Sequence, residues 1–367
     1  MNKFYLTIIS AAILVSACSK VADDMNPGIA QVDDDAWIYD ESLPVPVEFD
    51  MPGISVETKA VMTSDSFNSA HVCILGLSNG TDPWLQNSTN ATTLIPNDHD
   101  ATYGFKLESG QLGADFKGKY FYPMDNAEAF SFYGYFPANS MSSGWASVSS
   151  TQSRVSVKYN LDGITDILYA KSEAKDYNTG SGVLKGFTGE YIRKIKHDKK
   201  ESEYKPKLVF NHLLTRLDCT LKSAGDASTL KVSSVVILNT AKQVELVVAD
   251  KFNGQIEGTL SNKEKGDINF RYNNETSFEA GAGVELNNVN GIKLDPIMLL
   301  PGASYSCQFT FDNGQKSKPV DLKLPEGTFE AGKYYEMTFK VNSPEEVFIE
   351  IGFTDWQPGT GGGETEI

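Results

Sequence analysis

The stretch Tyr335-Glu-Met-Thr-Phe-Lys-Val341 alternates large apolar side chains with polar ones. A period of two puts the apolar side chains on one face of a β-strand, so this stretch predicts a half-buried strand. The same alternation occurs in Tyr305-Ser-Cys-Gln-Phe-Thr-Phe311 and in Val155-Ser-Val-Lys-Tyr-Asn-Leu161. Further examples are Val320-Asp-Leu-Lys-Leu324 and residues 213–222. One face of each strand is expected to pack in a core and the other to face water.

The connections between these runs are typical of antiparallel sheets. Asn-Gly and Asp-Gly pairs supply the positive-φ residues that hairpin turns need. Such pairs occur at Asn79-Gly80, Asp162-Gly163, Asn253-Gly254, Asn290-Gly291 and Asn313-Gly314. No long helical window competes with the strand pattern. The sequence therefore predicts an all-β, mostly antiparallel chain arranged as β-sandwiches.

The beginning of the chain has the pattern of an export signal. Lys3 is followed by the apolar residues 4–15, and Val15-Ser-Ala-Cys18 leads through small residues into a cysteine. The apolar run is too short to span a bilayer. This ending resembles a bacterial lipobox, which implies cleavage between Ala17 and Cys18 and acylation of Cys18, so that the mature chain is held on a membrane surface. The alternative is an ordinary secreted protein, with Cys18 merely near the cleavage site.

Residues 18–55 are acidic and interrupted by proline, as in Asp33-Asp-Asp35 and Pro44-Val-Pro46. A segment without a periodic apolar face is expected to tether the folded part to the lipid. An acidic run soon after a lipidated cysteine also resembles signals for transfer to the outer face of the outer membrane. The basic run 193–205 is expected to be a solvated interdomain loop rather than an anion site. The predicted organisation is a signal peptide over 1–17, an acidic tether or leader over 18–55, and two domains over 56–205 and 206–367.

The length and charge of the chain limit the classes of function that it can have. The chain has 367 residues, enough for two domains or one large β domain. Its formal net charge of −16 argues against a nucleic-acid partner, because phosphate binding draws its affinity from clustered Lys and Arg. Acidic surfaces of this kind mostly confer solubility.

Three cysteines remain if Cys18 is lipidated, namely Cys73, Cys219 and Cys307. All three lie in apolar strand patterns without metal-ligand spacing, which favours buried thiols. One disulfide with a leftover thiol is the alternative for an exported protein.

Two catalytic motifs occur in the wrong context. Gly76-Leu-Ser-Asn-Gly80 matches a nucleophile elbow around Ser78, but that chemistry needs a strand-to-helix turn on a mainly parallel sheet. The run Gly327-Thr-Phe-Glu-Ala-Gly-Lys333 is close to a phosphate-binding loop, yet Tyr334 stands where Ser or Thr is needed and a strand pattern follows. We therefore expect no catalytic residues, no enzyme activity and no cofactor.

Two ligand-binding patterns have simpler explanations. Asp98-His-Asp100 could hold a cation, most readily Ca²⁺, but Asp-rich surface loops are common, and we expect no metal site. The aromatic runs 120–122 and 130–136 could form a glycan platform, although alternate faces of core strands explain them better.

With the lipobox in place, several segments together resemble the fimbrillin family, the lipoprotein precursors of type V pilus subunits in Gram-negative anaerobes. The order and spacing of these segments match the family over nearly the whole mature chain. The segments are Phe130-Ser-Phe-Tyr-Gly-Tyr-Phe-Pro137, Asp166-Ile-Leu-Tyr-Ala170, Phe210-Asn-His-Leu-Leu-Thr-Arg-Leu217, Leu300-Pro-Gly302, Phe329-Glu-Ala-Gly-Lys-Tyr-Tyr335 and Asp355-Trp-Gln-Pro-Gly359.

The resemblance implies two transthyretin-like antiparallel β-sandwich domains and assembly by strand exchange. In such pilins a protease removes the leading strand with its lipid, and a strand from the next subunit fills the exposed groove, a form of β-augmentation. The family's processing site follows a basic residue, usually Arg. This chain has no arginine before Arg154, so cleavage is expected between Lys59 and Ala60.

The donor strand is expected in the C-terminal stretch, where four apolar side chains could fill successive pockets: Ile349, Ile351, Phe353 and Trp356. The competing interpretation leaves this strand in its own domain as ordinary core. The resulting hypothesis is a lipid-anchored fimbrial subunit or accessory protein that supports adhesion, with other fimbrial subunits as partners. The alternative is a surface lipoprotein that binds glycans or host ligands without polymerising.

Overall fold

The computed structural model describes residues 35–54, 64–84, 92–96, 104–124, 128–138, 146–150, 153–173, 175–180, 182–198, 204–225, 230–251 and 256–353. The predictions for Ala17, Cys18, Lys59, Ala60 and Trp356 lie outside the described residues. Within the described ranges no helix combines the length and apolar character needed to cross a membrane.

The described strands form three larger sheets and two small ones, and every pair is antiparallel except β2 with β14 and β15 with β23. The seven-stranded sheet has the order β22 (Val320–Lys323), β21 (Ser304–Phe311), β16 (Lys231–Asp250), β10 (Arg154–Asn160) and β9 (Ala146–Ser150), with β17 (Leu260–Asn269) and β18 (Val284–Glu285) also on β16. The eight-stranded sheet has the order β2 (Asp50–Ile54), β14 (Lys207–His212), β11 (Leu168–Glu173), β8 (Phe130–Phe136), β3 (His71–Ser78), β5 (Phe105–Glu108) and β6 (Gln111–Leu112), with β4 (Thr93–Ile95) on β3.

The five-stranded sheet has the order β19 (Ile292–Lys293), β15 (Thr215–Ser223), β23 (Tyr334–Ser343) and β24 (Glu346–Phe353), with β20 (Ile297–Leu299) on β15. The small sheets pair β1 (Val45–Pro46) with β7 (Phe121–Tyr122) and β12 (Tyr177–Asn178) with β13 (Val183–Leu184). The helical elements are η1 (Ala36–Ile38), α1 (Ser64–Phe67), α2 (Gly189–His197) and η2 (Phe278–Gly281).

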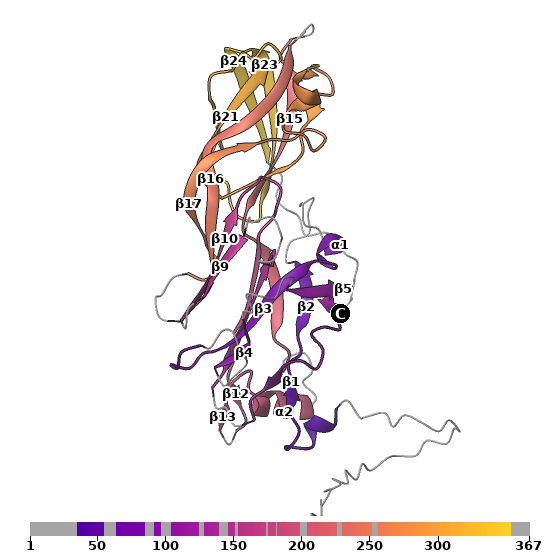
Figure 1. The fold of residues 1–367 in the computed structure, drawn as a ribbon, viewed down its shortest axis with the longest axis vertical. Helices are drawn as coiled ribbons and strands as arrows, with labels where there is room; N and C mark the ends of the chain where they lie inside the picture. Colours follow the sequence, from indigo (N-terminus) through magenta and orange to yellow (C-terminus); the bar gives the residue numbers. More distant parts are fainter. Residues whose placement is uncertain are drawn as a thin grey trace, which may run out of the picture.

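The long strand β16 belongs to both halves of an elongated molecule (Figure 1). In the upper half of the view its sheet packs on the five-stranded sheet, and the rings of Phe309 and Phe339 meet at 5.1 Å. In the lower half its sheet packs on the eight-stranded sheet, where the Tyr169 hydroxyl donates to the Val248 carbonyl at 3.0 Å. The predicted all-β, sandwich-like and mostly antiparallel fold is confirmed.

The eight-stranded sheet is buried on both faces. Along β8, Tyr133 and Tyr135 point into the core shared with β16, while Phe130 and Phe132 point into a second core on the opposite face. All seven residues of β8 are buried. The interpretation of this aromatic run as core is confirmed, and its side chains are not exposed as a glycan platform.

Sheet pairing crosses the predicted boundary at residue 205. Strand β14 follows that residue, yet it extends the sheet built from β2, β11, β8 and β3. Strands β9 and β10 precede it and pair in the sheet of β16. The division into 56–205 and 206–367 stays a prediction.

Part of the basic run 193–205 is helical, so the loop interpretation is wrong there. Helix α2 begins after Thr188, whose hydroxyl accepts a hydrogen bond from the Tyr191 amide at 3.2 Å. Ile192 and Ile195 are buried, because their spacing puts them on one face of the helix. In the sequence these isoleucines stand among charged residues, which conceal the short amphipathic pattern.

The cysteine interpretation is confirmed in its simpler form. Cys73, Cys219 and Cys307 are buried thiols outside any disulfide. Burial raises the pKa of the Cys219 thiol well above its usual value, with smaller contributions from Cys307 and Asp218. A thiol of this kind stays protonated and packs as a small apolar side chain.

Candidate functional site

Residues 35–54, the leading segment, are docked on the second core. Val45, Val47, Phe49 and Met51 alternate along it and pack into that core, with Val45 1% and Val47 5% exposed. The interpretation of this stretch as a tether without a periodic apolar face is therefore wrong. Its period-two pattern could have been found in the sequence, but the interspersed prolines hid it.

The leading segment also joins the backbone ladders. Val45 and Pro46 lie opposite Tyr122 and Phe121 in an antiparallel pair, and the Val47 amide donates to the Tyr120 carbonyl at 3.0 Å. Farther along, β2 pairs with β14 and is the outermost strand of the eight-stranded sheet. An edge strand is held by a neighbour on one side only, so it is among the easier strands to exchange.

Arg193 of α2 holds the backbone of the leading segment. Its Nε donates to the Trp37 carbonyl at 2.8 Å, and Nη2 donates to the carbonyls of Leu43 at 2.7 Å and Asp40 at 3.4 Å. A guanidinium presents a rigid fork of donors and suits such a cluster of carbonyl acceptors. Because these acceptors are backbone atoms, the contact does not depend on the side chains of the segment.

Lys196 lies one turn farther along α2 and holds the start of the segment. Its ammonium is 2.5 Å from the Asp35 carboxylate and 4.9 Å from the centre of the Trp37 ring. The ammonium also lies 5.5 Å from the centre of the Tyr204 ring. Burial, the largest single influence, would lower the pKa of Lys196, but the hydrogen bond to Asp35 and the nearby charges of Glu48 and Asp35 together raise the pKa above its usual value. The lysine is therefore cationic and pairs with both the carboxylate and the rings.

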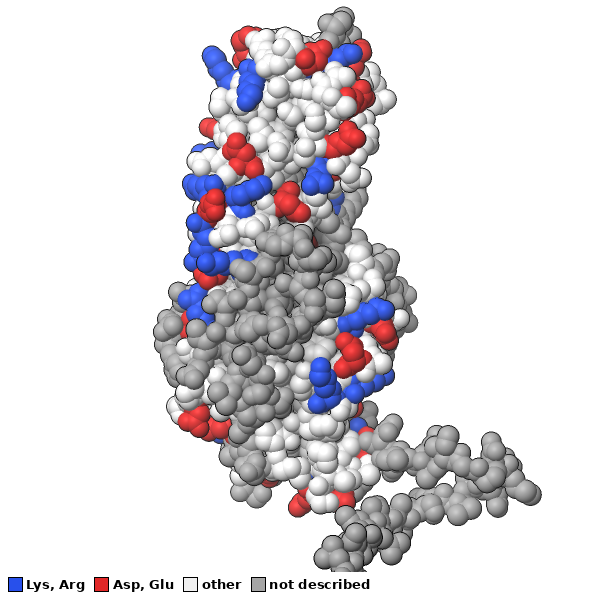
Figure 2. Space-filling view, in the orientation of Figure 1, with Lys and Arg blue, Asp and Glu red and all other residues white. Residues whose placement is uncertain are grey.

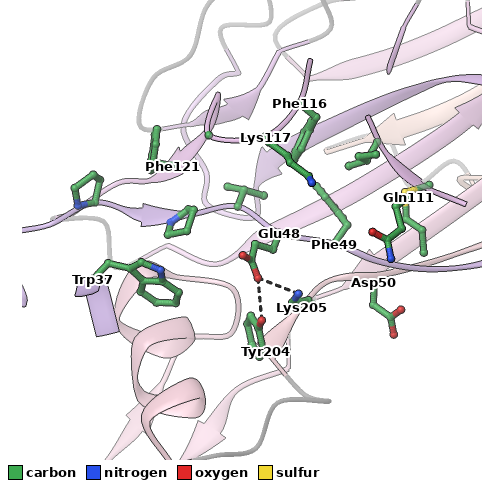
Figure 3. A pocket seen from close by; sticks show the side chains of 16 residues that line it. Trp37, Glu48, Phe49, Asp50, Gln111, Phe116, Lys117, Phe121, Tyr204 and Lys205 are labelled. Atoms are coloured by element: carbon green, nitrogen blue, oxygen red, sulfur yellow. Dashed lines mark hydrogen bonds and ion pairs between the residues drawn. The ribbon is translucent and has the colours of Figure 1, made fainter. Parts of the chain in front are cut away.

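Glu48 is the polar anchor in the middle of the segment. Its carboxylate accepts a hydrogen bond from the Tyr204 hydroxyl at 2.8 Å and forms an ion pair with Lys205 at 3.0 Å (Figure 3). Burial alone would raise the pKa of Glu48, but the bonds from Lys205 and Tyr204 prevail and the pKa lies below its usual range. The anionic form of Glu48 thus stabilises the docked segment.

An open groove of about 1090 Å³ runs beside the leading segment. Side chains of the segment, including Phe49, form part of its lining, and Phe116, Phe121 and Leu112 also line it (Figure 3). The segment therefore fills only part of the space between itself and the surrounding strands.

Acid is expected to loosen the docked segment. The stabilisation from Glu48 is complete above the ordinary glutamate pKa, about 4.3, and is lost as the pH falls through the lower folded value. Since the Glu48 side chain is 38% exposed, the loss should not exceed about 1 kcal/mol, or roughly fivefold in opening. Amide exchange of Val47, corrected for intrinsic rates, measures it between pH 6 and pH 3. If the Glu48→Gln variant loses protection of the Val47 amide to the same extent between pH 6 and pH 3, then Glu48 is not the group responsible.

Strand β24, the predicted donor, lies at an edge of its own sheet. Ile349 and Ile351 pair with Phe339 and Met337 of β23 and are only half-buried. Phe348 is 51% exposed. The backbone of Phe353 closes the ladder opposite Tyr335. The structure thus has the strand in its own sheet, and its donation stays a prediction.

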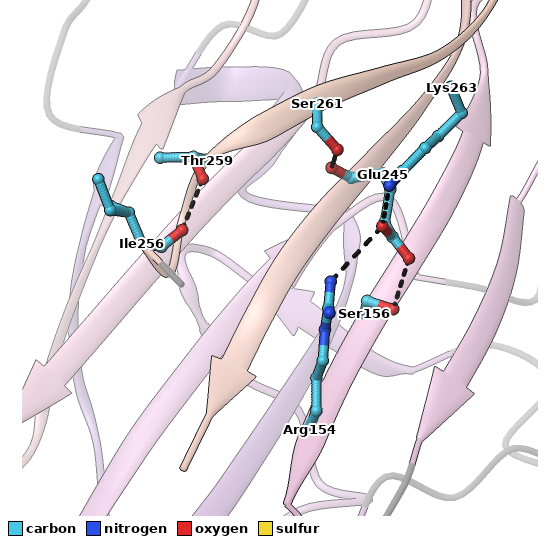
Figure 4. Close-up of polar contacts among 7 residues, drawn as sticks. All are labelled: Arg154, Ser156, Glu245, Ile256, Thr259, Ser261 and Lys263. Carbon is cyan, nitrogen blue, oxygen red and sulfur yellow. Dashed lines mark hydrogen bonds and ion pairs between the residues drawn. The ribbon is translucent and has the colours of Figure 1, made fainter. Parts of the chain in front are cut away.

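A second polar cluster crosses β10, β16 and β17 (Figure 4). The Glu245 carboxylate lies 2.6 Å from Lys263 and 3.5 Å from Arg154, and accepts from the Ser156 hydroxyl at 3.0 Å. Burial would raise the pKa of Glu245, but these bonds lower it overall. The cluster ties neighbouring strands together, and the surrounding face mixes basic and acidic side chains (Figure 2).

The motifs that the sequence analysis set aside, the nucleophile-elbow match and the candidate cation site, show no functional arrangement in the described residues. Ser78 ends β3, an antiparallel strand, and its hydroxyl accepts from the Gly80 amide at 3.0 Å, as in a turn. Among the described residues no group of three or more His, Cys, Asp or Glu side chains is arranged to hold a metal. Residues 97–100, with His99, lie outside the described part.

A family model described as fimbrillin-like matches residues 84–356, well over half of the chain. The chain belongs to the fimbrillin-like family. The resemblance seen in the sequence is thereby confirmed. A search of curated proteins gives no match.

Solved structures with a similar fold come from species of Bacteroides and Porphyromonas. A candidate cell adhesion protein from Bacteroides uniformis is 18% identical, with a TM-score of 0.46 over 86% of this chain and 99% of its own. The fimbrial anchor protein Mfa2 from Porphyromonas gingivalis is 11% identical, with a TM-score of 0.37 over 79% and 91%. The tip fimbrial protein Mfa3 from the same organism is 10% identical, with a TM-score of 0.35 over 79% and 95%. Because these scores are below 0.5, the family assignment rests on the family model.

Proposed function

We propose that this protein is a fimbrial subunit or fimbrial accessory protein that supports adhesion and carries out no catalysis. It is exported as a lipoprotein acylated on Cys18 and placed on the outer membrane at the cell surface. Its partners are other fimbrial subunits, either copies of itself or related chains. The observation that carries the proposal is the docked leading segment, which a member of the fimbrillin-like family could release and replace.

The physical step in this proposal is strand replacement. Cleavage between Lys59 and Ala60 separates residues 35–54 from the rest of the chain. Departure of that segment exposes the apolar positions of the second core and the edge of β14. Exposed apolar surface next to an open strand edge favours pairing with a strand of another subunit.

Lys59→Ala is expected to prevent both processing and assembly. The test treats the soluble chain from Lys20 onward with a trypsin-like protease, identifies the new N-terminus by sequencing, and follows assembly by size exclusion and negative-stain microscopy. Filaments or detergent-resistant ladders should appear only after cleavage. Lys20→Ala is the matched control, because it removes the preceding basic residue and should leave assembly unchanged.

Two outcomes would argue against the proposal. A chain that is cut after Lys59 and stays monomeric has no strand-exchange activity of its own. Filaments formed equally well by Lys59→Ala would show that cleavage there is not the trigger.

A further inference from the structure

An open hollow of about 560 Å³ lies where β16 passes from one half of the molecule to the other. Small-ligand sites have volumes of about 300 to 1,000 Å³ and often lie between two domains. The hollow forms because β16 changes its neighbour here. β21 pairs with β16 as far as Leu238, and β10 pairs with it from Gln243 onward. In the described part of the chain no strand covers residues 239–241 on that side, while β17 pairs along the opposite side.

Amide and hydroxyl side chains supply much of the lining of this hollow. On β21, Ser304 and Ser306 occupy the more exposed positions, which alternate with buried ones, so they point to the outer face of the sheet. Apolar contacts from Leu238 and Pro301 suit the carbon–hydrogen faces of a sugar ring. The amide and hydroxyl groups donate and accept hydrogen bonds, as a ligand rich in hydroxyl groups requires. These side chains are Asn239, Thr240, Asn262, Ser304 and Ser306.

One wall of the hollow is held in place before any ligand binds. The Tyr305 hydroxyl donates to the Leu300 carbonyl at 2.7 Å and so fixes the loop that precedes β21. In the same loop Gly302 exchanges two backbone hydrogen bonds with Phe329, at 3.1 and 2.9 Å. A preformed site loses less free energy to ordering when it binds a ligand.

Unpaired positive charge lies on one side of the hollow. Lys265 of β17 lines it, and the Lys242 side chain of β16 lies against the next residue of β17, Gly266. Neither ammonium group has an ion-pair or hydrogen-bond partner within the described ranges. The carboxylate of Glu245 on β16 is already held by two other basic side chains. Figure 2 shows basic side chains gathered along the left edge, where Figure 1 has β16 and β17. On a chain with a formal net charge of −16, unpaired ammonium groups favour an anionic ligand.

A carboxylate, that of Asp321, lines the other side of the hollow. The sheet order puts β21 and β16 between β22, which carries Asp321, and β17, which carries Lys265. Three strand spacings of about 4.8 Å separate these two strands by about 14 Å. No ion pair joins the two described side chains. The hollow therefore has a positive side for an acidic group and a side that accepts hydrogen bonds from neutral hydroxyls.

We propose that the hollow binds an acidic oligosaccharide, with a carboxylate or sulfate group on Lys265 and neutral hydroxyls on Asp321 and the amide and hydroxyl side chains. An acidic peptide fits less well, because a peptide strand adds along a continuous open edge and only residues 239–241 of β16 are open here. The site lies apart from the leading segment and from β24. It therefore gives each subunit a ligand of its own, whether or not the subunit assembles, which goes beyond the function proposed above.

Titration calorimetry on the uncut soluble chain from Lys20 onward tests the site. The probes are tetragalacturonate, a sulfated heparin tetrasaccharide and neutral maltotetraose. At least one acidic probe should bind, and Lys265→Glu should weaken its binding by at least about tenfold, because it places like charges together. Asn262→Ala, which removes a neutral contact, should weaken binding several-fold. Lys293→Glu is the matched control, because Lys293 is exposed on β19, in the sheet across the sandwich.

Three results would overturn the site: neither acidic probe binds, maltotetraose binds as tightly, or Lys293→Glu weakens binding as much as Lys265→Glu. A polyglutamate peptide that binds as tightly as the acidic sugars overturns the ligand class. Urea denaturation checks the folding of each variant, and Lys265→Gln, with a loss of several-fold, replaces Lys265→Glu if the latter is unstable.

Assembly is measured separately, so that the site and the proposed function can fail independently. After cleavage, the Lys265→Glu chain should form filaments as the unsubstituted chain does, since the hollow lies away from the leading segment. An unsubstituted chain that binds the acidic sugar but does not assemble contradicts the proposed function and leaves the site standing.

Discussion

Asp166→Ala is expected to lower the free energy of unfolding by about 3 to 5 kcal/mol. The Asp166 carboxylate lies 2.5 Å from Nδ1 of His212, and neither side chain is accessible to solvent. The pair joins β14 to the turn before β11, where Asp166 also accepts a hydrogen bond from the Ile167 amide at 2.8 Å. Removing the carboxylate leaves a buried imidazole without this partner, and urea denaturation measures the cost.

An exposed pair in the same half of the chain is the control. Asp176 lies 3.7 Å from Lys185, and both side chains are about half-exposed. Asp176→Ala should cost less than about 1 kcal/mol, because water screens surface pairs. An equally small cost for Asp166→Ala would mean that the buried pair contributes no more than a surface one.

Strands with one buried face and one solvent-exposed face could be predicted from the sequence. Tyr335, Met337, Phe339 and Val341 are buried along β23 as their alternation predicts. The signal is strong because only one face of β23 is fully buried, so polar residues mark the other. Its parallel pairing with β15, more than a hundred residues earlier, left no local trace in the sequence.

Strands buried on both faces gave a weaker signal. In β8, residues 130–136 are apolar, aromatic or small throughout, so no alternation separates the two cores. The leading segment has alternation, but its prolines made it look like a linker. Helix α2 is short and highly charged, and its apolar face comprises only a few residues.

The candidate site was predicted only in part. Ile349 and Ile351 were chosen for their alternation, and the structure has them on an edge strand, while the donation of that strand stays a prediction. Arg193 was not predicted, because its importance lies in carbonyl groups some 150 residues away in sequence. A contact from one side chain to distant backbone atoms imposes no pattern on the residues that supply those atoms.

Arg193→Ala is expected to release the leading segment without unfolding the rest of the chain. Charged hydrogen bonds contribute about 1.5 to 3 kcal/mol, and Arg193 makes bonds of 2.8 and 2.7 Å to the Trp37 and Leu43 carbonyls. A loss of about 2 kcal/mol increases opening of the segment roughly 30-fold. Amide exchange of Val47, which donates to Tyr120, should accelerate by that factor.

The neighbouring residue supplies the control. Lys194 is on the same helix but pairs with Asp198 at 2.5 Å, so Lys194→Ala should leave exchange at Val47 unchanged. Arg193→Lys keeps the positive charge but loses the fixed set of guanidinium N–H donors, so Val47 should exchange at an intermediate rate. If Arg193→Ala accelerates Val47 no more than Lys194→Ala, the guanidinium does not hold the segment. If it also accelerates exchange in β16, the variant has destabilised the whole fold, and the segment is not an independently releasable element.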